Sequence, residues 1–457
     1  MLRPIRLLTL GVTLGLLVVS GPLQAQDKSS LPLPENLFPD LKRILESAVR
    51  QSPRMIGRNV ENAIAEQNRL IARSGQLPTA GGYMSYYPYA RDDRADLSGA
   101  MNVKKFNYAF NIVQPIYHWG ALESNTRIGE LGKKITEGQT ADAYRMLIQE
   151  IRSLYLSVVV KKMIVSRSQL NLGVAQDQLA LAESKFEKKV IAESDMFSPR
   201  LNHDQAVLNV DRNTEDYESA KATLAKLSGT PVLSDNQIPT DVPNITVSPE
   251  PLNSYLTKFT SEKEPKTFYL ENLRNQIEIE KLNYKIADAR LKPKLNAVVG
   301  ASQDEQSYTS NIAAKYKVQS TYAGVSVSWS IFDGFAARST KAATLARQHQ
   351  AERTYEDAVA NLSDQARSAL KQLGFSARSM ELANRIQSAT EGYYHSRQDD
   401  VKRGLASESD VNAARISFFD AQLGATNARF DYMLKTGDFL SMILEDPALE
   451  NLPGHTP

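Results

Sequence analysis

The sequence repeats its own plan at a constant separation of 215 positions. Glu193-Ser194-Asp195 recurs as Glu408-Ser409-Asp410. We expect one extra residue near Trp119, and one missing soon after, to keep the register. A single recurring separation predicts a tandem duplication of a unit of about 200 residues, so the chain folds as two similar halves. The other matches at this separation are Pro78 with Pro293, Ile116-Tyr117 with Ile331-Phe332, Arg152-Ser153 with Arg367-Ser368, Arg200 with Arg415, and Asp216-Tyr217 with Asp431-Tyr432.

The N-terminus has the pattern of a secretory signal peptide. Arg3 and Arg6 precede an apolar run from Leu7 to Val19, and Leu23-Gln24-Ala25 suits a cleavage site. The run is shorter than the ~20 residues of a membrane-spanning helix, so we expect cleavage and not anchoring. The predicted organisation is a signal peptide at 1–25, an extended arm at 26–40, a first repeat at 41–230, a proline-rich linker at 231–250, a second repeat at 251–445 and a loose tail at 446–457.

Charge and cysteine content exclude several classes of protein. The formal charge of the whole chain is +2, and the two arginines of the signal account for it. The mature chain is therefore neutral, and no basic excess argues for a nucleic-acid partner. There is no cysteine, which excludes disulfides, thiolate metal sites and a lipidated N-terminal cysteine. No other run is apolar enough for a membrane helix, so an exported chain of this kind meets a membrane through strands or at its surface.

Two segments change from helical to alternating periodicity, and they predict strand pairs at about 80–117 and 294–332. The clearest is Tyr322 to Ile331, where Ala323, Val325, Val327, Trp329 and Ile331 share one face and glycine and serines share the other. Such alternation over about ten residues is typical of strands that cross an outer membrane. A half-buried sheet in a soluble domain alternates in the same way, so the strands alone leave both possibilities open.

Each strand pair is followed by a glycine turn and a long helical hairpin, at 121–228 and 335–444. Leu147, Ile151, Leu154 and Val158 step by three and four residues, as in a coiled-coil seam. The first run, from Ala121 to Lys188, would reach on the order of 100 Å. Soluble domains rarely contain helices of that length.

Four strands cannot close a membrane barrel, because the smallest known barrels need about eight. An open edge in lipid would leave backbone groups without hydrogen bonds. The barrel must therefore be shared among chains. Two copies would give about eight strands and a filled interior, whereas three would give about twelve and room for a channel.

The order of these features resembles the TolC family of outer-membrane efflux and secretion channels. The resemblance rests on a strand pair, a glycine turn and a long hairpin with the tip Gly404-Leu405-Ala406-Ser407, all repeated, and it extends from about Leu41 to Leu444. It implies a mostly α fold with membrane β, in which a homotrimer forms a twelve-stranded β-barrel continued by a coiled-coil α-helical barrel into the periplasm. It also implies docking to a periplasmic adaptor (membrane fusion protein) and to an inner-membrane pump of the RND, MFS or ABC type.

The resemblance implies a periplasmic constriction at Asp410. The family narrows its tunnel with two rings of aspartates, and the second ring falls here on Ala413. Three copies of Asp410 would form one carboxylate ring that attracts cations and could hold a blocking metal ion; no other metal or cofactor is expected. Ser407-x-x-Asp410 also has the spacing of a helix capping box, so Asp410 could cap the returning helix instead or as well.

Other site residues are assigned by the same resemblance. Asp195 suits a polar link between the hairpin tips, although its tyrosine and arginine counterparts fall on Val401 and Ala406. The tips are expected to contact the adaptor, or else simply to pack as turns: Val190, Ile191, Ala192, Gly404, Leu405 and Ala406. An aromatic girdle at the membrane interface is expected from Tyr83, Tyr87, Trp119 and Trp329, with ordinary core packing as the alternative.

Two other classes of protein share some of these features. A periplasmic coiled-coil adaptor also has a long helical hairpin, but normally one, and without four alternating strands. A secreted enzyme would need a catalytic constellation, and the five histidines show no metal-ligand spacing. Gly129 to Lys134 lacks the spacing and hydroxyl of a phosphate loop. The sequence therefore predicts a passive exit duct without enzymatic activity.

Overall fold

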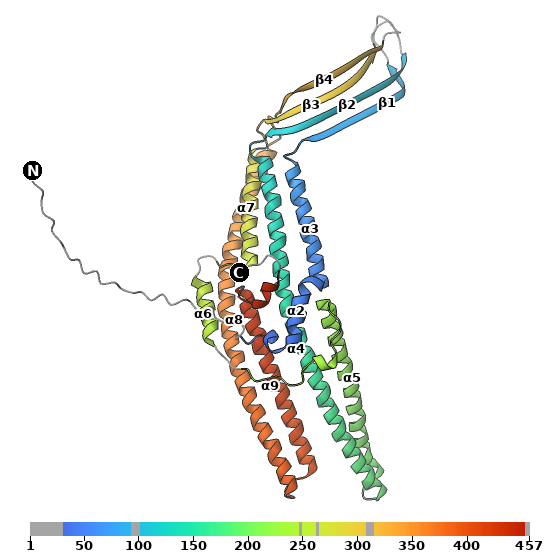
Figure 1. The fold of residues 1–457 in the computed structure, drawn as a ribbon, viewed down its shortest axis with the longest axis vertical. Helices are drawn as coiled ribbons and strands as arrows, with labels where there is room; N and C mark the ends of the chain where they lie inside the picture. The colour runs from blue at the N-terminus through green and yellow to red at the C-terminus, as the bar shows by residue number, and fades with distance from the viewer. Residues whose placement is uncertain (1–30, 93–100, 246–248, 262–264, 308–314, 453–457) are drawn as a thin grey trace, which may run out of the picture. The chain divides into compact units, whose positions relative to one another are not determined.

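The computed structural model describes residues 31–92, 101–245, 249–261, 265–307 and 315–452. The chain divides into residues 1–31 and a compact unit, Pro32–Pro457, and the description below concerns this second unit. It is mostly helical and contains one antiparallel sheet of four strands (Figure 1). The expected signal peptide at 1–25 lies outside the described residues.

The two halves share two helices, a strand pair and two long helices in the same order, and they differ in their short helices. The first has α1 (Pro34–Leu37), α2 (Pro39–Gln51), α3 (Pro53–Ser74), β1 (Thr79–Asp92), β2 (Met101–Tyr117), α4 (Ala121–Glu187), the 3-10 helix η2 (Glu193–Met196) and α5 (Phe197–Ser228). The connection contains η3 (Asp235–Gln237). The second has α6 (Pro249–Ser261), α7 (Phe268–Asp288), β3 (Lys294–Ser307), β4 (Lys315–Ser328), α8 (Ala336–Lys402), α9 (Glu408–Met442) and the 3-10 helix η4 (Pro447–Asn451).

The backbone confirms the duplication. Helices α4 and α8 are both 67 residues long. The first residue of α8 comes 215 positions after the first residue of α4, and the same separation holds for their last residues. Every described residue with positive φ has a counterpart at the same separation that also has positive φ. These pairs are Trp119 with Gly334, Gly120 with Phe335, Lys189 with Gly404, and Gly229 with Leu444.

The expected insertion and deletion near Trp119 are wrong, because the separation is unbroken there. Both strand-to-helix turns use two consecutive left-handed residues, Trp119-Gly120 in the first half and Gly334-Phe335 in the second. Glycine adopts this conformation most readily, and one glycine is present in each turn, but at different positions. The two left-handed positions of each turn are therefore 215 residues apart, but the glycine is the second of them in the first half and the first of them in the second half.

The sheet has the strand order β1-β2-β3-β4 (Figure 1). The two hairpins have the same register: Thr79 pairs with Val113, and Lys294 pairs with Ser328. The strands extend further toward the hairpin loops than alternation suggested, since β3 reaches Ser307 and β4 begins at Lys315. At the other end, β4 stops at Ser328, so Trp329 and Ile331 lie outside the strand that the sequence assigned to them.

The long helices lie in rows beside one another. Along the first half of α4, its neighbours are α3 and α7, and α7 in turn contacts α8. Gly138 of α4 lies so near α7 that a Cβ atom there would be 2.3 Å from Asn272 Oδ1. Along its second half α4 contacts α5 and α9, as the Ser168–Asn213 and Arg167–Asp420 contacts show, and α9 contacts α8. The rows are therefore α3-α4-α7-α8 and α5-α4-α9-α8.

A buried arginine joins both ends of the chain to α4. Arg152 is fully buried. Its guanidinium donates hydrogen bonds to the carboxylate of Glu35 in α1. It also donates to the carboxylate of Asp446, just before η4, from Nη1 at 2.6 Å and from Nη2 at 2.8 Å. Burial alone would lower the pKa of Arg152, but the charges of Asp446 and Glu35 outweigh it and raise that pKa. The arginine therefore remains charged inside the core.

This triad corrects two expectations about the chain ends. The arm at 26–40 is not extended over its described part, which contains α1 and the start of α2, with Leu33 and Phe38 buried. The tail at 446–457 is not loose over its described part, where Asp446 and Leu449 are buried. Both segments are held because their carboxylates neutralise a guanidinium that has no contact with water.

The linker at 231–250 is also partly packed. Ile238 and Val242 are buried against the helical core. Lys162 of α4 donates from Nζ to the carbonyl oxygens of Asp235, at 2.7 Å, and Ile238, at 2.6 Å. Hydrogen bonds to a lysine ammonium thus bind this connection to the first hairpin.

We predict that Arg152→Met lowers the free energy of unfolding by about 3–5 kcal/mol, because Glu35 and Asp446 would be left buried without a counter-charge. Denaturant unfolding followed by circular dichroism measures the change. The duplication supplies the control: Arg367, the counterpart of Arg152, is 59% exposed and pairs with Asp364. Arg367→Met should cost less than about 1 kcal/mol. Equal losses in the two variants would contradict a stabilising role for the buried triad.

Candidate functional site

The two faces of the sheet differ in polarity. Paired residues of neighbouring strands share a face, so the register places Phe110 and Ile112 beside Ala301 and Val299, and Asn111 beside Gly300. One face, here called the apolar face, is mostly apolar but also carries Gln114, Gln303, Gln319 and Thr321; its apolar residues are Met84, Tyr86, Phe106, Tyr108, Phe110, Ile112, Ala297, Val299, Ala301, Ala323, Val325 and Val327. The other, here called the polar face, carries Ser85, Asn107, Asn111, Asn296, Gly300, Ser302, Ser320, Gly324, Ser326 and Ser328, together with Tyr83, Tyr87, Ala109, Val113, Val298 and Tyr322.

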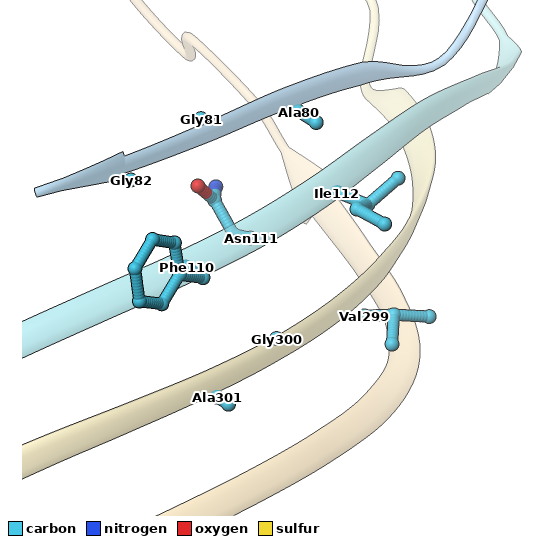
Figure 2. A pocket seen from close by; sticks show the side chains of 9 residues that line it. All are labelled: Ala80, Gly81, Gly82, Phe110, Asn111, Ile112, Val299, Gly300 and Ala301. Atoms are coloured by element: carbon cyan, nitrogen blue, oxygen red, sulfur yellow. The ribbon is translucent and has the colours of Figure 1, made fainter.

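Two aromatic rings lie across glycines of the neighbouring strand. A Cβ atom at Gly82 would be 2.3 Å from the Phe110 ring, and one at Gly300 would be 2.5 Å from the Tyr322 ring. The small residues around Phe110 leave a hollow of about 530 Å³ across β1, β2 and β3. Figure 2 shows the side chains that line it. A larger residue at either position would force the ring to move, because the ring occupies the space of the missing side chain.

The register does not support the expected girdle role of Tyr83 and Tyr87. Tyr83 pairs with Ala109 and Tyr87 pairs with Lys105, which places both tyrosines on the polar face. Met84 and Tyr86, their sequence neighbours, are on the apolar face. The tyrosine-rich composition of β1 did not show which face of the sheet each tyrosine is on, because tyrosines occur on both faces of this strand.

Trp119 and Trp329 lie just beyond the strands, where the sheet joins the helices. Each indole Nε1 donates to a carbonyl of the turn between α7 and β3: Trp119 to Pro293 at 2.8 Å, and Trp329 to Leu291 at 2.9 Å. The Lys292 ammonium lies 5.4 Å from the centre of the Trp119 ring. Both indoles are exposed, and their place in an aromatic girdle stays a prediction.

The first half contains the counterpart of one of these hydrogen bonds, with an amide donor in place of an indole. Gln114, the counterpart of Trp329, donates from Nε2 to the carbonyl of Gln76, the counterpart of Leu291, at 2.9 Å. The duplication therefore conserves a side-chain contact as well as the backbone.

Both sheet edges and both row edges are open within the chain. β1 and β4 each pair on one side only in the described sheet. The helices at the row edges expose apolar side chains at helical spacing. These are Ile56, Val60, Ile64 and Ile71 on α3, Leu201 and Leu208 on α5, and Phe375, Leu382, Ile386 and Tyr393 on α8.

Asp410 closes a capping box at the start of α9. Its Oδ2 accepts from the backbone nitrogen of Ser407 at 2.9 Å and from Ser407 Oγ at 2.7 Å, while its own backbone nitrogen donates to Ser407 Oγ at 3.2 Å. These hydrogen bonds, from the Ser407 hydroxyl and then from its backbone, lower the pKa of Asp410. The carboxylate is exposed, so the capping role leaves it free to face a channel.

Asp195 is also engaged within its own tip. Its Oδ2 accepts from the backbone nitrogen of Ala192 at 3.0 Å. In the described part of the chain no hydrogen bond joins Asp195 to the second hairpin. The expected link between tips remains a prediction about the assembled protein.

The hairpin tips expose apolar side chains. Val190 is 69% exposed and Leu405 is 73% exposed, and Phe197 continues the exposed surface on α5. Lys189 and Gly404 have left-handed backbones that turn the chain at the end of each first helix. Ile191, Ala192 and Ala406 complete the two tips.

Sequence reasoning missed the Arg152 triad and the open apolar edges. A signal for Arg152 was present, since this charged residue interrupts a helical face formed by Ile148, Ile151 and Tyr155. Its partners could not be identified, because Glu35 and Asp446 are 117 and 294 positions away.

No group of three or more His, Asp or Glu residues within the described ranges is arranged to hold a metal ion. No helix in the described part of the chain combines the length and apolarity needed to cross a membrane.

Solved structures of outer-membrane channels share this fold. The Campylobacter jejuni CmeC outer membrane channel matches with a TM-score of 0.70 and 15% identity, over 88% of this chain and 85% of that one. The Vibrio cholerae outer membrane protein VceC matches at 0.66 and 14%, over 89% and 96%. The Neisseria gonorrhoeae MtrE outer membrane channel matches at 0.65 and 14%, over 91% and 92%. A comparison with curated proteins gives no significant match.

A sheet with open edges and an apolar face, joined to two long helical hairpins, is the fold of these outer-membrane channels. The family model for outer membrane efflux proteins matches residues 44–230 and 270–433, more than half of the chain. The chain therefore belongs to the outer membrane efflux protein family. Family membership makes it an efflux channel protein of the outer membrane with its helical part in the periplasm, and nothing supports the alternative of a periplasmic adaptor.

We predict that cysteines at neighbouring positions of β1 differ in accessibility in the membrane-embedded protein. Tyr83→Cys should react with a charged, water-soluble maleimide, whereas Met84→Cys should be protected, because successive side chains of a strand point to opposite faces. The chain has no cysteine of its own, so labelling is specific. Faster labelling at position 84 than at 83 would show that the polar face is not the water-filled one.

We predict that Ser407→Ala raises the pKa of Asp410 toward its ordinary value, because the carboxylate loses the hydroxyl donor. Because the pKa of Asp410 is lowered, its carboxylate stabilises the helix fully at pH values above the ordinary pKa of aspartate. This stabilisation is lost as the pH falls through the lowered pKa. In the variant the stabilisation should be lost at a higher pH. Titration of ¹³C-labelled aspartate carboxyls measures the shift. Ser409→Ala, which removes the adjacent hydroxyl, should leave the pKa unchanged, and a similar rise in both variants would contradict the capping assignment.

Proposed function

We propose that three copies of this chain form the outer-membrane exit duct of a tripartite efflux pump or a type I secretion system. Substrates enter from an inner-membrane pump and leave passively, and the pump supplies the energy. The duct is not an enzyme and binds no cofactor. Its substrates are drugs, other small molecules or polypeptides, according to the pump.

The open edges are the observation that carries this proposal. β1 and β4 expose backbone N–H and C=O groups, which cannot remain unpaired in lipid. Pairing of β4 in one copy with β1 in another satisfies both edges. The same arrangement covers the apolar stripes. Each helical row begins at α3 or α5, on the side of β1, and ends at α8, on the side of β4. When β4 of one copy pairs with β1 of the next, the exposed apolar residues of α8 therefore face those of α3 and α5.

Closure of this head-to-tail contact requires a ring. Three copies supply twelve strands, enough to surround a channel, whereas an eight-stranded barrel from two copies would be filled by side chains. The apolar face then meets lipid, and the polar face lines the channel. Trp119 and Trp329 form the girdle at the periplasmic side.

The hairpins supply the partner surface and the constriction. The exposed tips, Val190 to Ala192 and Gly404 to Ala406, dock a periplasmic adaptor through apolar contacts. Asp410 projects from the second tip as one ring of three carboxylates, which favours cations at the periplasmic end. This ring is a second role for the residue that caps α9.

The test is ion conductance of the purified mature protein in a planar bilayer, together with its native mass in detergent. We expect discrete conductance steps and three times the subunit mass. Asp410→Asn keeps an acceptor for the cap but removes the charge, so cation selectivity should fall.

Asp195→Asn is the matched control, because Asp195 is the counterpart of Asp410 and also accepts a backbone hydrogen bond in its tip. Its effect on selectivity should be smaller. A folded protein that neither trimerises nor conducts would overturn the proposed function. Unchanged selectivity in Asp410→Asn would overturn the constriction alone.

A further inference from the structure

We propose that a cavity between α4, α7 and α8 binds a phosphate group, presented by a membrane phospholipid or by a phosphate-bearing solute. The cavity has a volume of about 370 Å³. Ala121 and Lys294, with which α4 and β3 begin, both line it, so it lies where the helices join the sheet (Figure 1). It is formed within one chain and does not require a ring of copies. Only the lipid as a source rests on the proposed function, which puts the sheet in the membrane.

The charges of the lining favour an anion. Among the described residues that line the cavity, three are cationic and none is acidic: Arg290, Lys294 and Arg347. Arg290 pairs through Nε with Asp333 Oδ2 at 3.1 Å, and Arg347 Nε lies 4.0 Å from Glu280 Oε2, too far for a hydrogen bond. The Lys294 ammonium pairs with no acid of the described chain. The terminal nitrogens of both arginines and the ammonium are therefore available to an oxyanion, and an arginine fork matches the geometry of phosphate.

The end of a long helix also points to an anion. Ala121 is the first residue of α4, and its N-cap, Gly120, contributes no side-chain hydrogen bond. The positive end of this helix therefore adds to the charge of the cavity. The carboxyl end of α7 borders the same space and opposes this effect, so the three side chains supply most of the positive charge.

The duplication shows that the fold does not require these three cations. The equivalent place in the first half lies between α3 and α4, where the counterparts of Arg290, Lys294 and Arg347 are Gly75, Thr79 and Gly132. A Cβ atom at Gly132 would meet nothing within 4 Å, so no packing contact calls for a long side chain there. Three cations gathered around one cavity of the second half alone indicate a ligand of opposite charge.

The duplication also explains why there is space. Gly129 of α4 lies so close to α3 that a Cβ atom there would be 2.7 Å from the Cβ atom of Ala72. Their counterparts, Thr344 of α8 and Ala287 of α7, both line the cavity. Because threonine has the Cβ atom that Gly129 lacks, α8 cannot approach α7 at this level as α4 approaches α3.

Isothermal titration calorimetry of the purified full chain in a neutral detergent tests the site. Dihexanoyl phosphatidylglycerol and sodium phosphate are titrated separately, and dihexanoyl phosphatidylcholine provides the same tails without net charge. We expect saturable binding of an anionic probe at one site per chain. Lys294→Gln and Arg347→Gln should each weaken it by about tenfold, because each removes one charged donor.

The matched control is Lys285→Gln, which removes the same charge from an exposed position of α7 outside the cavity. It should leave the dissociation constant unchanged. Thr344→Met fills the cavity without changing the charge and should prevent binding, and circular dichroism shows whether each variant is folded. Equal weakening by Lys285→Gln and Lys294→Gln, or no saturable binding of either anionic probe, would overturn the inference.

The probes also distinguish the two sources of phosphate. Tighter binding of phosphatidylglycerol than of inorganic phosphate identifies a lipid headgroup, whereas inorganic phosphate bound as tightly or more tightly identifies a solute. Phosphatidylcholine bound as tightly as phosphatidylglycerol would overturn a site based on charge. Native mass and conductance of the same preparation test the proposed function separately: a monomeric protein that binds the anion would refute the ring of copies and retain this site.

Discussion

Hydrogen bonding of the backbone at the two sheet edges is the constraint on which the rest of the molecule depends. Lipid offers no donors or acceptors, so a membrane sheet must have no free edge. This chain supplies only four strands and ends with β1 and β4 open. The single chain is therefore an incomplete structure. Its apolar stripes on α3, α5 and α8 are exposed in the same way, and the proposed ring of copies would cover both the stripes and the sheet edges.

The duplication turns this constraint into a simple solution. A unit of strand pair and helical hairpin that joins a copy of itself within the chain can join a copy in another chain by the same contacts. The first-half contact between Gln114 and the Gln76 carbonyl, and the second-half contact between Trp329 and the Leu291 carbonyl, show how the two units diverged. In both halves a side-chain N–H donates to this carbonyl; the donor is an amide in the first half and an indole in the second.

The chain ends break the symmetry of the two halves. Arg152 is buried between Glu35 and Asp446, whereas its counterpart Arg367 is exposed on α8. Around this arginine the terminal segments pack against α4 and also against α9, where Phe38 meets the edge of Phe430. The packed connection around Ile238 adds to the same region. A buried ion pair of this kind adds little net stability, whereas removal of one partner alone is strongly destabilising because it leaves the other charge buried and unpaired. It fixes where two segments from opposite ends of the chain attach.

The sequence by itself determined the duplication, the strand pairs and the two hairpins, because these follow from spacing and periodicity along the chain; the shared barrel stays a prediction. The capping box at Asp410 was also local and could be read from Ser407-x-x-Asp410. Only the tertiary structure decided which tyrosines of β1 share the polar face, because parity is set by pairing with Ala109 and Lys105 on another strand. The packing of both chain ends was likewise undetermined by sequence. Arg152 could be recognised as unusual, but its partners are separated from it by long stretches of chain, and folding alone brings them together.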